Sequence, residues 1–480
     1  MSKWSLLPEE MRLQVLDALA HGGNGKRGLT NYSLVCKSWQ SIFEKANFRR
    51  LVLHQSDLDG LDRIPKRCWP YVRHVWLRIE LGEYCPSGSI TPERLEDTAA
   101  YNDLVELAVG GLFGALKSWE KVVEPDFRGM TLELSIHSPS DSRYLCRGVH
   151  AKDLDRQTPL AQGRTDSGSS VRVEGALARV FGGYVHIKFC HRLPRLNLVK
   201  RFIIPRHTRR RFTSFTLHQI LHGLPRLEYL AYEPWRQFLD TMQDMVDAGY
   251  VNLVKGSLPV GLKHVVFLED HEYGEATIPE PSGSAEEAPT RKPNPYFGAA
   301  LASRSLGFEN LSASFLVEAR DFFRAYKPEW IWRDLRSLTL TSQYLDSQRS
   351  SHEINGMLQA AGEAALAMPM LQTLEIWNGG AGQAAIFRYH GGRGEAAVIA
   401  WTGTWDLVFS PHVVAAWQRV GLKHHRCQTL AVERRPIANA HDIRGFGDVM
   451  ELLRTKEHVA SWQSMNELRY EVENRCMCYP

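Results

Sequence analysis

The chain has 480 residues, of which 44% are hydrophobic and 23% charged, and its formal net charge is +4 at pH 7. This composition is typical of a folded globular protein with room for more than one domain. The absence of a long apolar stretch or a leader-like N-terminus argues against a membrane or secreted protein, and the low charge argues against a nucleic-acid partner. We therefore expect a cytoplasmic or nuclear protein whose eight cysteines are reduced thiols.

The first fifty residues predict a small group of helices. Pro8 suits a first helical turn, where its missing N–H costs nothing, and Glu9 and Glu10 follow at the positive end of the helix dipole. One apolar stripe comes next, at Met11, Val15, Leu16 and Leu19. A second apolar face follows a Gly-rich break, at Leu29, Tyr32, Leu34, Val35, Trp39, Ile42 and Phe43. So small a group cannot bury this much apolar surface, and we expect a partner to cover it.

These residues resemble the F-box motif, in which Leu-Pro and an acidic residue precede spaced aliphatic residues and then Val-Cys-Lys-x-Trp. The matching positions are Leu7, Pro8, Glu10, Val15, Leu16, Leu19, Val35, Cys36, Lys37 and Trp39. The resemblance implies a three-helix F-box domain at residues 1–50 that binds the Skp-type adaptor and, through it, the cullin of an SCF ubiquitin ligase. The residues implied to face the adaptor or to form the core of the F-box domain are Leu7, Pro8, Met11, Val15, Leu16, Val35, Cys36 and Trp39. The connection at 20–28 is longer and richer in Gly than is usual in the family.

A second pattern recurs along residues 51–480, in which an apolar residue is followed by a second three positions later and a third two positions after that. Its copies begin at Val72, Val199, Leu227, Leu262, Leu335, Leu371 and Cys427. The pattern resembles the strand segment of leucine-rich repeats. From Val199 the starts are 28, 35, 73 and 36 residues apart, so the longest interval has room for one degenerate unit.

The segments between these copies predict helices at 215–224, 234–248, 316–326 and 354–367. We therefore predict a mixed α/β (α+β) fold, in which the three-helix F-box precedes an irregular leucine-rich-repeat-like solenoid that binds a protein substrate. The missing repeat asparagine and the uneven spacing leave open an irregular α/β domain with one large sheet. Alternating residues predict further strands at 75–81, 132–136 and 185–189, and a hairpin from 387–389 to 398–401. This hairpin and the segment 401–405 are also similar to the C-terminal region of filamentous-fungal F-box proteins.

Two polar segments interrupt this order, at 154–171 and 270–295. Their composition cannot bury enough apolar surface to offset the entropy of ordering, so we expect flexible insertions. A lid or a phosphorylatable switch is the alternative to a passive insertion.

The sequence offers little evidence of catalysis. Residues Gly23–Gly28 match G-x-G-x-x-G in letters, but they follow a helix, whereas a dinucleotide site needs a preceding strand. Common nucleophile, phosphate-loop and zinc motifs are missing, so we expect no enzymatic activity, no cofactor and no metal. The clusters His424-His425-x-Cys427 and Cys476-x-Cys478 are interpreted as surface or packed side chains, because a metal needs four converging ligands. An enzyme with an unfamiliar site remains a third hypothesis.

A basic run is the sharpest charge feature, and it comprises Lys200, Arg201, Arg206, His207, Arg209, Arg210 and Arg211. Arg206, Arg209, Arg210 and Arg211 are the candidates for binding a substrate or phosphate, since a guanidinium pairs with such groups in a bidentate manner. The alternatives are a nuclear import signal, a weak nucleic-acid patch and a plain solvated loop. Seven tryptophans of the C-terminal half are interpreted as core residues or as recognition anchors: Trp235, Trp330, Trp332, Trp377, Trp401, Trp405 and Trp417.

Together these features favour the substrate-recognition subunit of an SCF-type E3 ubiquitin ligase. Such a subunit forms no covalent bond itself and acts by holding a substrate close to the conjugating enzyme. The alternative is a scaffold that binds the adaptor or another helical partner without promoting ubiquitination. The sequence does not identify the substrate.

Overall fold

The computed structural model describes residues 4, 7–21, 29–84, 95–122, 127–144, 180–181, 183–236, 242–270, 293–392 and 395–474. The predicted insertion at 154–171 and the Gly-rich motif at 23–28 lie outside these residues. Of the insertion predicted at 270–295, only 270 and 293–295 are described.

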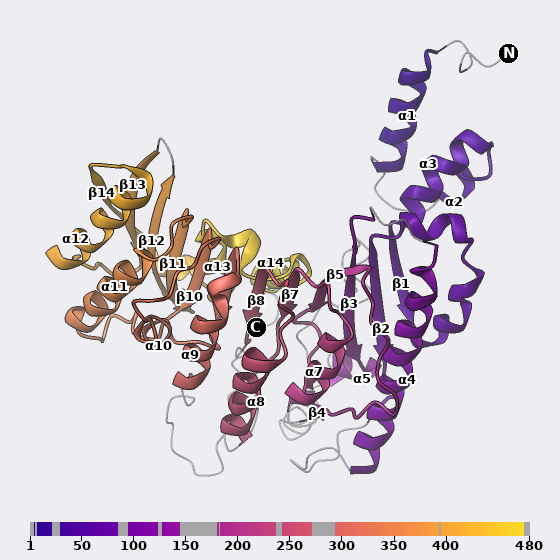
Figure 1. The fold of residues 1–480 in the computed structure, drawn as a ribbon, viewed down its shortest axis with the longest axis horizontal. Coiled ribbons are helices and arrows are strands. Elements are labelled where there is room, and N and C mark those ends of the chain that lie inside the picture. The colour runs from indigo at the N-terminus through magenta and orange to yellow at the C-terminus, as the bar shows by residue number, and fades with distance from the viewer. Residues whose placement is uncertain are drawn as a thin grey trace.

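Twelve strands of the described residues form one sheet, and their order across the sheet follows their order in the chain (Figure 1). They are β1 Arg50–His54, β2 His74–Glu80, β3 Met130–His137, β5 Val199–Ile204, β7 Tyr229–Tyr232, β8 His264–Leu268, β9 Asn310–Ser314, β10 Ser337–Thr341, β11 Thr373–Gly380, β12 Gln383–Gly392, β13 Glu395–Gly403 and β14 Leu430–Pro436. Neighbours pair in parallel except at β12, which is antiparallel to both β11 and β13. A second sheet pairs β4 Tyr184–Val185 with β6 Arg211–Phe212. The fold is therefore mixed α/β with a large, mostly parallel sheet.

The register of the sheet explains the recurring apolar pattern. One row of paired residues crosses all twelve strands: Leu51, Val75, Leu132, Phe202, Leu230, Val265, Leu311, Leu338, Leu374, Tyr389, Ile399 and Val432. Ten of its members are buried, and the two exceptions, Leu51 and Val432, lie on the edge strands. Alternate residues of a strand point to one face, so this row belongs to the face that packs against helices.

All seven predicted copies of the pattern lie at strands, which confirms these assignments. The long interval from 262 to 335 contains β9, where Phe308, Leu311 and Ala313 repeat the spacing. This interval therefore contains one more strand with the same apolar spacing. Strand β1 repeats the spacing again at Phe48, Leu51 and Leu53.

The α-helices alternate with these strands. They are α1 Glu9–His21, α2 Leu29–Tyr32, α3 Lys37–Asn47, α4 Leu95–Trp119, α5 Pro139–Tyr144, α7 Ser214–His222, α8 Gln243–Gly256, α9 Pro295–Arg304, α10 Ala319–Arg324, α11 Ser351–Ala365, α12 Pro411–Val420, α13 Phe446–Leu452 and α14 Trp462–Asn474. Shorter helical turns are η2 Gln55–Arg63, η3 Lys66–Tyr71, η5 Ser305–Gly307, η6 Gly421–His425, η7 Ala440–Asp442 and η8 Lys456–His458.

The predicted helices at 215–224, 316–326 and 354–367 correspond to α7, α10 and α11. The prediction at 234–248 was wrong at its start, because α8 begins only at Gln243. Trp235 instead forms a parallel β-bridge with Asp270, which holds the chain extended there. The predicted hairpin is present as β12 and β13, whereas 185–189 contributes only the end of β4.

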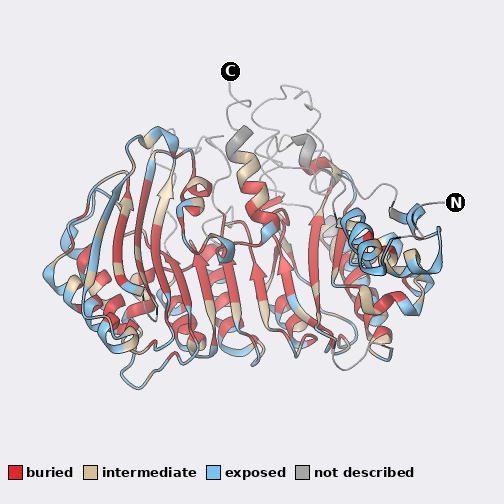
Figure 2. Cartoon of the chain, turned by 90° about the horizontal axis from the view of Figure 1, so that it is seen from above, coloured by how far each residue is buried: buried red, intermediate tan, exposed pale blue. Residues whose placement is uncertain are grey.

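The two faces of the large sheet are covered differently. Helices α4 and α7 to α12 cover one face and share the main apolar core with it (Figure 1). The C-terminal segment, residues 443–474, covers part of the opposite face and contains α13, η8 and α14 (Figure 2). Of the seven tryptophans, five are buried, and Trp330 and Trp405 are half-buried. No helix in the described parts of the chain is long and apolar enough to cross a membrane.

Replacing Leu338 by Ala should test the importance of the apolar row. Leu338 is fully buried in β10, so the change should lower the free energy of unfolding by about 2–5 kcal/mol, as measured by urea denaturation. The control Val260→Ala removes apolar atoms from a side chain that is 96% exposed, and should change stability by less than about 0.5 kcal/mol. Equal effects of the two changes would contradict the assignment.

Candidate functional site

An exposed apolar surface lies on the N-terminal helices, which project from one end of the sheet (Figure 1). Eight of the twenty-one large apolar side chains that are exposed among the described residues fall within residues 7–35. They are Leu7, Met11, Leu13, Val15, Leu19, Tyr32, Leu34 and Val35. Leu34 is 80% and Val35 59% exposed. A concentration of this kind is typical of surfaces that bind another molecule.

The residues predicted to contact an adaptor divide into two groups. Four belong to this surface, namely Leu7, Met11, Val15 and Val35, and Pro8 and Cys36 are also exposed. Leu16 is 3% exposed and therefore belongs to the interior of the helical group, which is one of the two roles that the resemblance implies for these residues. Trp39 is half-buried among aromatic rings, with centroid distances of 5.7 Å to both Trp4 and Phe43.

The N-terminal helices are held to the rest of the fold by polar contacts as well as by the covalent connection from α3 to β1. Glu44 of α3 accepts two hydrogen bonds from Arg67 of η3, of 2.8 Å and 3.2 Å. The hydrogen bond from Arg67 is the main cause that lowers the pKa of Glu44. Helix α3 ends at Asn47 and β1 begins at Arg50, so the helical group lies at the edge where the parallel strands begin.

The basic run is divided by the fold, and the interpretation of it as an exposed or solvated group is wrong for most of its members. Lys200 and Arg201 lie on β5, whereas Arg206, Arg210 and Arg211 are buried. Arg210 donates two hydrogen bonds to Asp141, of 2.7 Å and 3.1 Å, and Arg211 pairs with Glu269 at 3.4 Å. These buried guanidinium groups are paired with the chain's own carboxylates, so the structure does not present them to a substrate or phosphate.

Two further members of the basic run, His207 and Arg209, are also not exposed. Burial, together with nearby Arg78, lowers the pKa of His207 to about 3, so its imidazole is neutral at physiological pH. Arg209 is half-buried and has interactions of its own. Of the four arginines predicted to bind phosphate, none is an exposed side chain.

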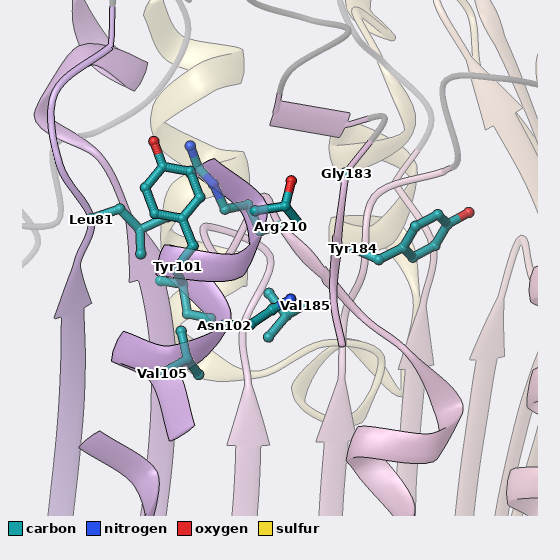
Figure 3. A pocket seen from close by; sticks show the side chains of 10 residues that line it. Leu81, Tyr101, Asn102, Val105, Gly183, Tyr184, Val185 and Arg210 are labelled. Carbon is teal, nitrogen blue, oxygen red and sulfur yellow. The ribbon is translucent and has the colours of Figure 1, made fainter. Parts of the chain in front are cut away.

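A small pocket opens beside Arg210, between α4, β4 and the ends of β2 and β3 (Figure 3). Its lining residues are Leu81, Thr98, Tyr101, Asn102, Val105, Ile136, Gly183, Tyr184, Val185 and Arg210. The space inside is about 10 Å³, which accommodates no more than about one water molecule. It is therefore too small to be a substrate site.

The C-terminal segment is held to the sheet by buried carboxylates that sequence analysis did not identify. Glu375 of β11 accepts hydrogen bonds from the backbone N–H groups of Arg454 and Thr455, at 3.0 Å and 2.9 Å. Glu233, directly after β7, accepts hydrogen bonds from Ser461 and Ser464. All these acceptors are fully buried, and unpaired they would cost several kcal/mol each, on the order of 2–7.

Glu133 of β3 is a third buried carboxylate that the C-terminal segment pairs, because Gln463 donates a hydrogen bond to it at 2.7 Å. The sequence patterns contained a signal for two of these residues. Glu375 lies between the last two apolar residues of the copy that begins at Leu371, and Glu133 lies between Leu132 and Leu134 of the strand predicted at 132–136, so both face away from the helices. A carboxylate at that position of a buried parallel strand requires a partner on the opposite face.

Arg206 is the centre of the largest buried charge group. It pairs with Asp270, with Glu467 at 3.3 Å and with Glu471 at 2.8 Å, and its guanidinium lies 4.6 Å from the ring centroid of Trp235. Among the described residues, neither carboxylate oxygen of Glu467 has a hydrogen-bond partner. Burial raises the pKa of Glu467 to about 7, and the nearby Glu471 acts in the same direction, against the opposing effect of Arg206.

The His424 cluster has a structural role. His424 Nε2 lies 3.1 Å from the carbonyl oxygen of Leu366, and Lys423 donates a hydrogen bond to the same oxygen at 3.0 Å. These side chains therefore satisfy carbonyl groups just beyond the C-terminal end of α11. Cys427 is half-buried, Cys476 and Cys478 lie outside the described residues, and within the described ranges no group of three or more metal-binding side chains converges.

Comparison with known proteins gives one match. Residues 257–461 are similar to a family of unknown function, DUF6546. This span runs from the end of α8 to the residue before α14, and it does not include the N-terminal helices. No curated protein matches the chain.

Replacing Glu467 by Gln should change how stability depends on pH. The raised pKa means that the folded state binds a proton more tightly than the unfolded state, in which a glutamate has a pKa of about 4.3. This favourable contribution is fully present below that value and is lost as pH rises through about 7. Relative to the wild type, Glu467→Gln should therefore become more stable from pH 5 to pH 8, as measured by urea denaturation.

Glu457→Gln provides the matched control, because it removes an exposed carboxylate from the same C-terminal segment. Its stability relative to the wild type should not vary over this range. Parallel pH profiles for Glu467→Gln and the wild type would contradict the assignment of a protonated Glu467.

Proposed function

We propose that this chain is the substrate-recognition subunit of an SCF-type ubiquitin ligase, in which the F-box at residues 1–50 docks on a Skp-type adaptor. The observation that carries the proposal is the exposed apolar surface on α1 and on the turn at residues 33–35. A helical group that formed only a hairpin of the main domain would turn these side chains inward instead.

The F-box residues divide into buried and exposed positions, and this division supports the proposal. Leu16 and Phe43 are buried and provide the interior of the helical group, which fixes the relative positions of α1 and α3. Met11, Val15 and Val35 then remain exposed for a partner. Exposed apolar side chains on a rigid frame bind with a smaller loss of entropy than mobile ones.

The sheet supports the second part of the proposal, an irregular leucine-rich-repeat-like solenoid. Its strand order follows the chain, and helices return along one face between parallel strands, as expected when each unit packs only on its neighbours. The antiparallel β12 and the uneven repeat lengths make it irregular. The substrate would be held by this region while the adaptor positions the complex, so catalysis is by proximity.

One observation favours the alternative function of a scaffold. The C-terminal segment covers part of the face that such a solenoid would leave open, so that face offers less surface to a substrate. A scaffold would bind the adaptor without delivering a substrate. The two functions differ in whether cullin is recruited along with the adaptor.

Co-purification with a Skp-type adaptor and cullin tests the proposal. Val35→Asp places a charge on the exposed surface without disturbing the interior, because Val35 is 59% exposed. We expect it to weaken adaptor capture at least about tenfold, and the double change Leu7→Ala/Pro8→Ala to act in the same direction. Val408→Asp alters a side chain that is 64% exposed in the connection after β13, and should leave capture unchanged.

The outcomes separate the candidate functions. Capture of both adaptor and cullin that depends on Val35 supports the receptor. Adaptor capture without cullin favours the scaffold. A folded chain that captures no adaptor would contradict the F-box assignment.

A further inference from the structure

A row of basic side chains lies along the edge where the parallel strands begin. One row of paired residues near the start of the strands runs from Arg50 on β1 to Thr373 on β11. Each of the nine strands that it crosses, β1 to β11 without β4 and β6, contributes its residue in that row and the residue before it. These eighteen positions hold seven lysines and arginines: Arg49, Arg50, Arg73, Lys200, Arg201, Lys263 and Arg336. We call this set the basic edge.

The charge of the basic edge is concentrated. The same eighteen positions hold only two carboxylates, Glu228 and Glu309, so their net charge is +5 with histidines neutral. The whole chain has a net charge of +4, which means that the rest of it is nearly balanced. Glu228 pairs with Lys200 at 2.7 Å and Glu309 with Lys263 at 2.9 Å, so both carboxylates are already matched with lysines of the edge.

Several arginines of the edge are held in place by aromatic rings. The guanidinium of Arg201 lies 3.7 Å from the ring centroid of Tyr229, and that of Arg73 lies 4.4 Å from the ring centroid of Phe127. Both arginines are exposed. Stacking fixes the plane of a guanidinium and leaves its N–H groups available to carboxylates, so these side chains lose little entropy on binding an anion.

The aromatic contacts also favour a polypeptide over a nucleic acid. Single-stranded nucleic acid needs open aromatic faces on which bases stack. At this edge the rings of Tyr229, Phe127 and Trp76 each have an arginine over one face, that of Arg50 lying 5.1 Å from the Trp76 ring centroid. The rings therefore support cations here.

The spacing of the arginines suits an extended chain. Arg73 directly precedes β2 and Arg201 lies on β5, and β3 separates these two strands. Two strand spacings correspond to about 10 Å, and three residues of extended polypeptide span the same distance. A short acidic stretch that crosses the edge is therefore long enough to reach both Arg73 and Arg201.

We propose that the basic edge binds an acidic, aspartate- and glutamate-rich segment of a substrate polypeptide. The inference rests on the proposed function and assigns a substrate class to it. Because α3 leads directly into β1, the F-box and the basic edge lie at the same end of the strands. A substrate bound there would lie at the same end of the strands as the adaptor. The C-terminal segment covers part of one face of the sheet and leaves the side chains of Arg73 and Arg201 exposed, so this site is open.

Fluorescence anisotropy with a fluorescein-labelled oligoglutamate peptide, added to the full-length chain in about 50 mM NaCl, tests the inference. The double variant Arg73→Glu/Arg201→Glu should bind at least about tenfold more weakly than the wild type. Arg434→Glu/Arg435→Glu is the matched control, because it reverses two exposed charges on β14 at the far end of the sheet, and its affinity should stay within about twofold. Unchanged circular dichroism would show that the variants are folded.

Two results would overturn the inference: equal weakening in both double variants, or no binding of the peptide by the folded wild type. A labelled oligothymidine that binds more tightly than the peptide, and loses affinity in Arg73→Glu/Arg201→Glu, would assign the edge to nucleic acid instead. Adaptor capture is measured on the same preparations. A chain that binds peptide at the basic edge but captures no adaptor contradicts the proposed function and not the binding surface.

Discussion

The structure depends on one row of apolar side chains that crosses the large sheet in register. Each strand can bury its member of the row only if its neighbours are aligned, since a slip by one residue would turn the apolar set toward the opposite face. Helices α4 and α7 to α12 complete the burial on one side. The recurring apolar spacing in the sequence therefore reflects a single packing requirement, which extends from β1 at Leu51 to β11 at Leu374.

The opposite face follows a different principle. There the strands carry carboxylates in place of some apolar residues, and these groups tolerate burial only because the C-terminal segment supplies donors to them. Glu375 accepts hydrogen bonds from backbone N–H groups, and Glu233 accepts hydrogen bonds from serine hydroxyls. Hydrogen bonds of this kind are directional, so they fix where the segment lies more strictly than apolar contacts would. Arg206, with three carboxylates around it, joins β5, β8 and α14 into one unit.

Two further features are concentrated at the surface. The exposed apolar side chains are concentrated on the N-terminal helices, and the excess positive charge is concentrated on the adjacent edge of the sheet. Apolar area supplies much of the free energy of a stable interface, whereas charge steers and selects a second ligand. The two surfaces thus suit two different kinds of contact at the same end of the strands.

Local spacing in the sequence was sufficient to predict most of the strands, the helices α7, α10 and α11, the hairpin of β12 and β13, and the apolar helical group at the N-terminus. It succeeded because periods of two and near 3.6 residues follow directly from strand and helix geometry. Only the tertiary structure decided that Arg206, Arg210 and Arg211 are buried and that the C-terminal segment covers part of the sheet. Those outcomes depend on pairs such as Glu133 and Gln463, which are 330 residues apart in the chain. No local period records such a pair, so a run of arginines has the same pattern whether it meets water or buried carboxylates.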